Sequence, residues 1–174
     1  KHAIVAVYRL IWLVVVLAMT GCSDYGSPTP PASSAGSAHQ RLALLGIDER
    51  NVLRIREDAR HNRLWVLTLD QVRVFDVATK RTKLIREMAL PNWSVAQFDD
   101  ACIPDLALDP SGSAFISNNV QTRLWQIDAD SFETRELEIV LQGKEQWDVG
   151  FGPLAFAADG VLYAVTSVLG SVWK

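Results

Sequence analysis

The chain has 174 residues, of which 49% are apolar, enough to bury the core of one domain. Its formal net charge is −3 and it contains no run of lysine or arginine, so we expect no nucleic-acid partner. The two cysteines, Cys22 and Cys102, lie in different settings, and we do not interpret them as a disulfide.

Residues 1–21 have the pattern of a signal peptide. The basic residues Lys1, His2 and Arg9 precede an apolar run over residues 10–19, which is too short to cross a bilayer core of about 30 Å. The run ends at four residues that resemble a lipobox, Met19-Thr20-Gly21-Cys22. An uncleaved signal anchor and an ordinary cleavage site beside Cys22 are the alternatives.

The lipobox resemblance implies that Cys22 is lipidated and becomes the N-terminus of the mature protein. Several acyl chains on one residue would hold the protein stably on a membrane, with the rest of the chain outside the cytoplasm. Ser23 after the cysteine favours the outer membrane if the cell is Gram-negative. We therefore expect a cell-envelope location.

Residues 22–40 contain the lipidated cysteine and a linker rich in serine, proline, alanine and glycine. The linker has almost no large apolar side chains, so burial cannot offset the entropy lost on ordering it. We expect a flexible tether that holds the domain formed by residues 41–174 away from the membrane.

The domain contains an internal repeat. One aromatic series has spacings of 50 and 48 residues, and a second series has the same two spacings. The first series is Trp65, Phe115 and Tyr163, and the second is Phe75, Trp125 and Trp173. Two series with one period indicate a repeated structural unit.

Each repeat has the pattern of short strands between turns. In the second copy we predict strands at 106–109, 114–117 and 124–127, with a half-buried outer strand in which Leu137, Ile139 and Leu141 alternate with other residues. Residues 42–52 could hold a short helical turn, and no later stretch sustains helical periodicity.

Four strands in a period of 40–50 residues are typical of a β-propeller blade. Residues 105–112 and 123–128 resemble the propeller superfamily that includes WD40-like, NHL and gluconolactonase-type proteins. The resemblance implies an all-β fold, a partial β-propeller of four-stranded antiparallel blades, with about two and a half blades present. Because a ring needs at least about 4 blades, we expect a fragment of a longer chain. A small β-sandwich is the alternative.

Blade topology places certain loops at one end of the sheets. Residues 87–103, 118–121 and 142–152 share that end with Asp70 and Gln71. Long polar loops carry function disproportionately, so we predict a binding surface there. Its candidate residues are Trp93, Asp99, Asp100, Asn118, Asn119, Trp147 and Asp148. The two tryptophans could instead pack between blades.

A metal site is the alternative for the acidic loop residues. Oxygen ligands suit Ca²⁺ or another divalent cation, and the candidate ligands are Asp99, Asp100, Asp105 and Asn118. The gluconolactonase resemblance implies a metal-dependent lactonase-like hydrolase that would use such a site. We favour solvated loop side chains instead, and therefore expect no cofactor.

The sequence does not assign catalytic residues. His61 has no serine or aspartate at triad spacing, and there is neither a glycine-rich phosphate loop nor a Cys-x-x-Cys motif. We therefore predict a membrane-anchored, extracytoplasmic lipoprotein with a non-enzymatic binding or scaffold domain. Its partner would be an unknown protein or small-molecule ligand.

Overall fold

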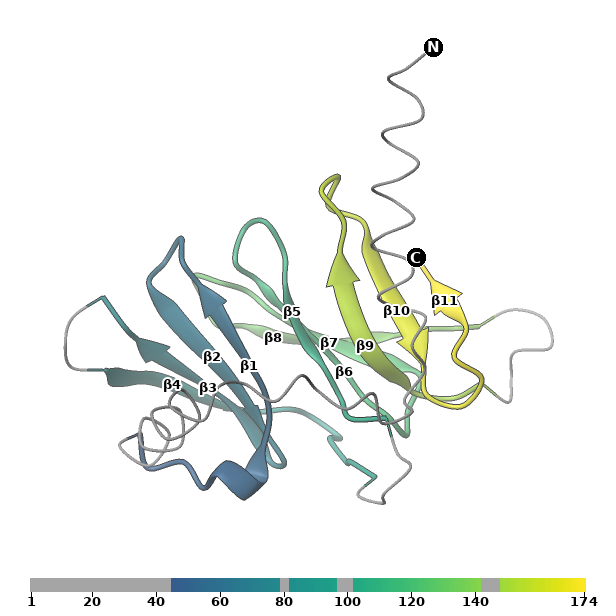
Figure 1. The fold of residues 1–174 in the computed structure, drawn as a ribbon, viewed down its shortest axis with the longest axis horizontal. Helices are drawn as coiled ribbons and strands as arrows, with labels where there is room; N and C mark the ends of the chain where they lie inside the picture. The colour runs from purple at the N-terminus through teal and green to yellow at the C-terminus, as the bar shows by residue number, and fades with distance from the viewer. Residues whose placement is uncertain (1–44, 79–81, 97–101, 142–147) are drawn as a thin grey trace, which may run out of the picture.

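The computed structural model describes residues 45–78, 82–96, 102–141 and 148–174. These residues form three antiparallel β-sheets, which lie side by side in chain order (Figure 1). The predicted all-β class is confirmed, and the described sheets do not close on themselves. The part of the chain that the structure describes holds no helix with the length and hydropathy of a membrane span.

Each sheet is a meander in which consecutive strands pair. The first sheet consists of β1 (Val52–Asp58), β2 (Arg63–Thr68), β3 (Gln71–Asp76) and β4 (Lys83–Ala89). The second sheet consists of β5 (Leu106–Leu108), β6 (Ala114–Ser117), β7 (Arg123–Ile127) and β8 (Thr134–Glu138). The third sheet consists of β9 (Phe151–Phe156), β10 (Leu162–Thr166) and β11 (Val172–Trp173).

The predicted strands of the second copy are confirmed, with small shifts at their ends. The outer strand β8 ends at Glu138, so the alternating residues Ile139 and Leu141 lie beyond it. The predicted turn before the first sheet is a 3₁₀ helix, η1 (Glu49–Asn51). The side chain of Asp48 caps this helix by accepting a hydrogen bond from the backbone N–H of Arg50.

A local hydrogen-bonding pattern makes the tight turn between β5 and β6. Asp109 Oδ1 accepts hydrogen bonds from the backbone N–H groups of Ser111 and Ser113, at 2.8 and 3.0 Å. Gly112 completes the turn with a φ of 92°, a conformation that side-chain-bearing residues avoid. The Asp-Pro-Ser-Gly sequence therefore determines this hairpin locally.

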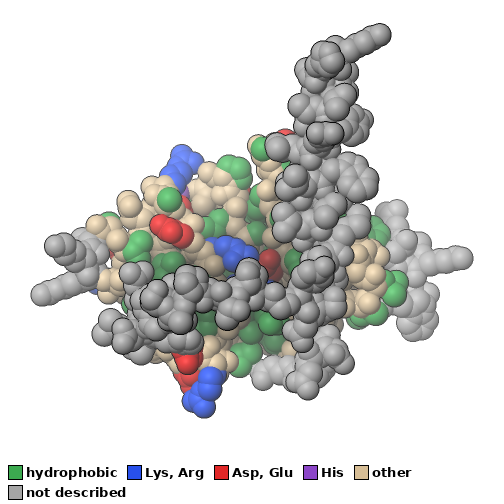
Figure 2. Space-filling model, viewed as in Figure 1, with side chains coloured by type: hydrophobic (Ala, Val, Ile, Leu, Met, Phe, Trp, Pro, Cys, Tyr) green, Lys and Arg blue, Asp and Glu red, His purple; other side chains and the backbone are tan. Residues whose placement is uncertain are grey.

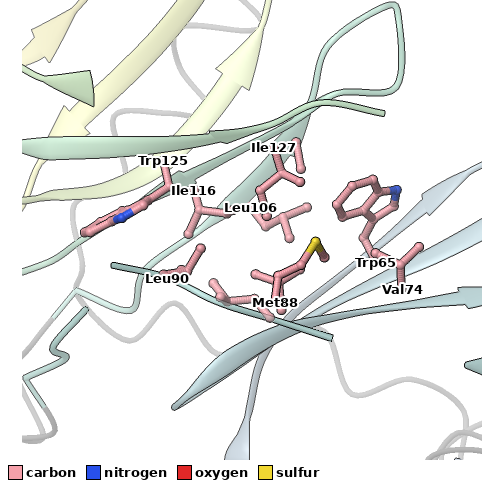
Figure 3. Packing of buried hydrophobic residues seen from close by; sticks show 11 residues of the cluster. Trp65, Val74, Met88, Leu90, Leu106, Ile116, Trp125 and Ile127 are labelled. Carbon is pink, nitrogen blue, oxygen red and sulfur yellow. The ribbon is translucent and has the colours of Figure 1, made fainter. Parts of the chain in front are cut away.

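The largest core lies between the first and second sheets (Figure 3). Trp65, Val74 and Met88 of the first sheet point toward Leu106 and Ile127 of the second. Burial of each such side chain contributes about 1.5–3 kcal/mol, so this interface is a major source of stability. The remaining buried members of the cluster are Leu67, Val72, Leu90, Ala114, Ile116 and Trp125.

A second core joins the second and third sheets. Its buried members are Ala107, Leu124, Phe151, Leu154 and Ala164. Phe115 and Phe156 pack against it and meet edge to face, with ring centroids 5.2 Å apart. The sheets are thus joined in series by two apolar layers.

The repeated aromatics have equivalent positions in the three sheets. Trp65, Phe115 and Tyr163 lie on the second strand of each sheet. Trp65 packs toward the second sheet, and Phe115 packs toward the third. In the first and second sheets, the aromatic residue on the second strand therefore packs against the next sheet along the chain.

The other aromatic series faces the opposite way. Phe75, Trp125 and Trp173 lie on the third strand of each sheet. Trp125 packs toward the first sheet and Trp173 toward the second, whereas Phe75 packs with Ile47 in a third cluster that covers the outer face of the first sheet. The repeat in the sequence is thus a repeat of packing direction.

The far face of the third sheet is partly exposed to solvent. Tyr163 and Val172 lie on this face and are 38% and 45% exposed. Tyr163 pairs with exposed Ala155, and Val172 pairs with Val165, which is buried.

Candidate functional site

Four loop segments meet at one end of the sheets, which we call the loop end. They are the β2–β3 turn, residues 90–96, residues 118–122 and residues 148–150. Trp93 Nε1 donates to the backbone oxygen of Leu69 at 2.9 Å, and the Phe151 N–H donates to the oxygen of Asn118 at 2.7 Å. These bonds confirm, for the described residues, the prediction that the loops share one end.

Asn118 organises the β6–β7 loop. Its side chain is completely buried. Oδ1 accepts hydrogen bonds from the N–H groups of Val120 and Gln121, both at 2.9 Å, and Nδ2 donates to the oxygen of Ser94 at 2.6 Å. Since the oxygen already holds two backbone donors, it is committed to the fold rather than available to a cation.

Asn119 attaches the segment after β4 to the second sheet. Its Oδ1 accepts from the N–H of Ala96 and its Nδ2 donates to the Ala96 oxygen, both at 3.0 Å. The amide thus pairs with the backbone as a neighbouring strand would. Asn119 is buried, as Asn118 is, so neither has the exposed position that its loop sequence predicted.

Asp148 is a buried carboxylate that fixes the end of the third sheet. Oδ2 accepts from Thr166 Oγ1 at 2.6 Å and Oδ1 accepts from the N–H of Leu169 at 2.8 Å. Burial alone raises the pKa of Asp148, but these hydrogen bonds outweigh burial and hold the pKa below its ordinary value. The carboxylate therefore stays ionised and serves as an anchor for the 167–171 turn.

Trp93 packs between the sheets. Its ring lies against the core of the first and second sheets, and it meets Trp125 edge to face with centroids 5.1 Å apart. The indole N–H of Trp125 donates to the oxygen of Pro91 at 3.0 Å. Of the two roles that the sequence left open for Trp93, the structure shows packing.

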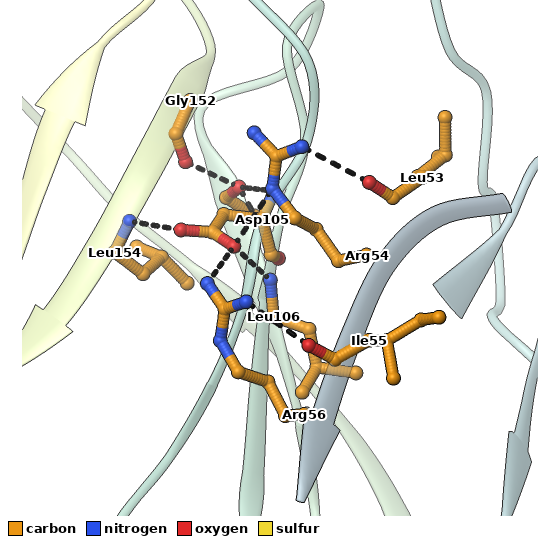
Figure 4. Close-up of polar contacts among 9 residues, drawn as sticks. Leu53, Arg54, Ile55, Arg56, Asp105, Leu106, Gly152 and Leu154 are labelled. Carbon is orange, nitrogen blue, oxygen red and sulfur yellow. Dashed lines mark hydrogen bonds and ion pairs between the residues drawn. The ribbon is translucent and has the colours of Figure 1, made fainter. Parts of the chain in front are cut away.

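Asp105 lies at the start of β5 and links all three sheets (Figure 4). Arg54 Nε and Arg56 Nη2 of β1 donate to its Oδ1 at 3.1 and 2.8 Å. The N–H of Leu154 in β9 donates to Oδ2 at 3.0 Å, and the N–H of Leu106 donates to Oδ1 at 2.8 Å. Two guanidinium groups beside this carboxylate oppose the approach of a metal ion.

Arg54 and Arg56 were not selected by the sequence analysis. They alternate along β1, so both side chains lie on the face toward the second sheet. Each is separated from Asp105 by about one repeat period, 51 and 49 residues. A search for opposite charges one period apart would have found them.

The described residues do not assemble a metal centre. Among residues 45–78, 82–96, 102–141 and 148–174, no three His, Cys, Asp or Glu side chains are grouped to hold a metal ion. The side-chain oxygens of Asp105 and Asn118 accept the hydrogen bonds described above. The predicted candidates Asp99, Asp100 and Trp147 lie outside the described residues, as does Cys22.

Cys102 has a covalent state that the sequence analysis did not predict. It is buried and disulfide-bonded. The prediction that the two cysteines do not form a disulfide with each other also concerns Cys22, which lies outside the described residues.

Comparison with known proteins assigns no relationship. No protein-family model matches the chain, and no curated protein matches it at a significant level.

Proposed function

We propose that this protein is an exported lipoprotein, attached to the cell envelope through Cys22, whose β-sheets are propeller blades that display a binding surface at the loop end. The sequence pattern of residues 1–22 supports export and attachment to a membrane. The partner in this proposal is a protein or small-molecule ligand, and the domain acts as a scaffold rather than an enzyme.

The packing direction of the repeated aromatics supports the propeller. In a propeller every blade contacts the preceding blade with one face and the following blade with the other. Trp125 and Phe115 of the second sheet point in these two directions. The inner strands β1, β5 and β9 also adjoin, as they do around a propeller axis. In a ring, the open face around Tyr163 would meet a further sheet.

The observation that carries the binding role is the rigid construction of the loop end. The side-chain amides of Asn118 and Asn119 hold the segment that contains Ser94 and Ala96 by three hydrogen bonds. Loops fixed in this way present their remaining exposed groups without an ordering cost when a partner binds. A hairpin end built only from short turns lacks such a surface.

Fractionation of the cell envelope tests the proposed membrane attachment. Cells that produce the wild-type chain should hold it in the membrane fraction, where radioactive palmitate labels it. The Cys22→Ser variant should carry no label and should keep its signal peptide. Equal palmitate incorporation by the two proteins would overturn the lipid-anchor proposal.

Site-specific photo-crosslinking tests the binding surface. A photoreactive amino acid at exposed Ser94 of the loop end should give a discrete adduct in intact cells. The matched control is exposed Asp159 in the β9–β10 hairpin, at the opposite end of the third sheet, which should give none. Adducts of the same size and yield from both positions would contradict a partner at the loop end.

A further inference from the structure

Two arginines of one inner strand converge on a single buried carboxylate. Arg54 and Arg56 project from the same face of β1 and both donate to Oδ1 of Asp105 (Figure 4). The second oxygen of Asp105 is taken by the N–H of Leu154. The cluster lies where β1 adjoins β5 and β5 adjoins β9, and the backbone of Asp105 pairs with Ser117, next to the loop end.

The charges of this cluster do not balance. Two guanidinium groups carry two positive charges, and Asp105 supplies one negative charge. The cluster therefore has one positive charge in excess. No other acidic side chain forms an ion pair with Arg54 or Arg56 among the described residues.

Arg54 and Arg56 also have N–H donors that these hydrogen bonds do not use. A guanidinium has five N–H donors. Arg54 uses Nη1 on the oxygen of Leu53, and Arg56 uses Nη1 on the oxygen of Ile55, in addition to their bonds to Asp105. Their other N–H groups have no hydrogen-bond partner within the part of the chain described here.

The leftover donors are accessible. The side chains of Arg54 and Arg56 are 31% and 40% exposed, whereas the Asp105 side chain is 7% exposed. Figure 2 shows basic side-chain atoms that reach the surface near the centre of the molecule, beside acidic atoms. The carboxylate thus fixes the guanidinium groups from below and leaves part of each open to solvent.

We propose that Arg54 and Arg56 form a binding site for a compact oxyanion, of the phosphate or phosphate-ester class. Such an anion has several acceptor oxygens in a tetrahedral arrangement and can accept from both planar guanidinium groups at once. The anion would neutralise the excess charge. This proposal does not depend on the partner proposed at the loop end.

Inorganic phosphate is the probe for this site. The full chain, purified in detergent, is titrated with phosphate at constant ionic strength and followed by ³¹P line broadening and calorimetry. Saturable binding is expected. Arg54→Gln and Arg56→Gln should each weaken it by about tenfold, the value of one charge-assisted hydrogen bond.

A matched control separates the site from general charge. Arg135→Gln removes one positive charge from a side chain that is 67% exposed and lies in the second sheet, and it should leave phosphate binding unchanged. The variant Arg54→Lys retains the charge but not the planar fork, and it should bind phosphate more weakly than the wild type. Thermal melting of each variant checks that it folds.

The Asp105→Asn variant tests whether the negative charge of Asp105 weakens phosphate binding. Removal of the internal counter-charge should strengthen phosphate binding by about tenfold, provided that the variant melts cooperatively. The proposal is overturned if the wild type binds no phosphate saturably, or if Arg54→Gln and Arg135→Gln bind it equally. The titration of the wild-type protein needs no variant, so the proposal can be tested even if the substituted proteins do not fold.

Discussion

Trp93 and Trp125 meet edge to face, with their ring centroids 5.1 Å apart and their planes at 78°. Trp93 belongs to the segment that crosses from the first sheet to the second, and Trp125 is fully buried on β7. The contact therefore connects the loop end directly to the main core. Through it, the segment at residues 90–96 shares the rigidity of the sheets that it joins.

The two fully buried tryptophans of this core should respond differently to the loss of their indole N–H. Trp125 Nε1 donates to the oxygen of Pro91, whereas Trp65 Nε1 has no partner in the described structure. Trp125→Phe should therefore destabilise the protein by about 1 kcal/mol more than Trp65→Phe, because only the former breaks a hydrogen bond. Urea denaturation measures both. A Trp65→Phe variant that is the less stable of the two would contradict this interpretation.

Gly150 should be far less tolerant of substitution than Gly160. Both have positive φ, 75° and 82°. A Cβ at Gly150 would lie 2.4 Å from the backbone oxygen of Asn119, whereas a Cβ at Gly160 would meet nothing within 4 Å. Gly160→Ala should cost about 1 kcal/mol from the backbone conformation alone. Gly150→Ala should cost about 2 kcal/mol more, because the loop end must shift to admit the methyl group.

Thermal and urea unfolding of the two glycine variants provide the comparison. The Gly150 variant should also lose the resonance pattern of Asn118 and Asn119 in amide spectra, since their loop contacts residue 150. Equal losses of stability at the two positions would show that the close approach of Gly150 to Asn119 does not exist in solution.

Asp148 should make stability depend on pH in the acid range. Its pKa is lower in the folded protein than in the unfolded chain, where it is about 3.9. The stabilisation is therefore fully present above the unfolded pKa and is lost as the pH falls through the folded pKa. At pH 7, Asp148→Asn should cost about 1.5–3 kcal/mol, the value of a hydrogen bond to a charged group.

The pH dependence itself is the check on Asp148. The difference in unfolding free energy between wild type and Asp148→Asn should shrink once the pH is below about 4. A difference that stays constant from pH 7 to pH 3 would mean that the Thr166 and Leu169 hydrogen bonds do not favour the ionised carboxylate.

The sequence predicted the fold at the level of strands because the signals for strands are local. Alternating apolar residues and Asp-Pro-Ser-Gly turns act over a few positions, and the strands at 106–108, 114–117 and 123–127 lie where these signals placed them. The spacing of the aromatic residues also predicted that the chain contains three copies of the repeat. Their packing directions follow from strand register, which becomes clear only when the strands are paired.

The roles of the candidate site residues could not be predicted in the same way. Asn118 and Asn119 have the sequence of a solvated turn, but their partners Ser94 and Ala96 lie 24 and 23 residues away. A polar side chain that satisfies a distant backbone group looks, in sequence, like one that faces water. Asp105 illustrates the same limit, since its arginine partners come from the preceding sheet.

The sulfur of Cys22 cannot be both lipidated and part of a disulfide. The proposed lipid anchor attaches a diacylglycerol group to this sulfur through a thioether, and a thioether sulfur has no thiol left to form a disulfide. The proposed function therefore requires that Cys22 carries the lipid in the mature, processed protein. This requirement makes the N-terminus the most informative part of the molecule to examine.

Mass spectrometry of the N-terminal peptide, from protein purified out of membranes without reductant, tests the central claim most directly. The account predicts that the chain begins at Cys22 and that this residue carries the mass of attached acyl chains. A peptide that retains residues 1–21, or one that joins Cys22 to Cys102 through a disulfide, would contradict it.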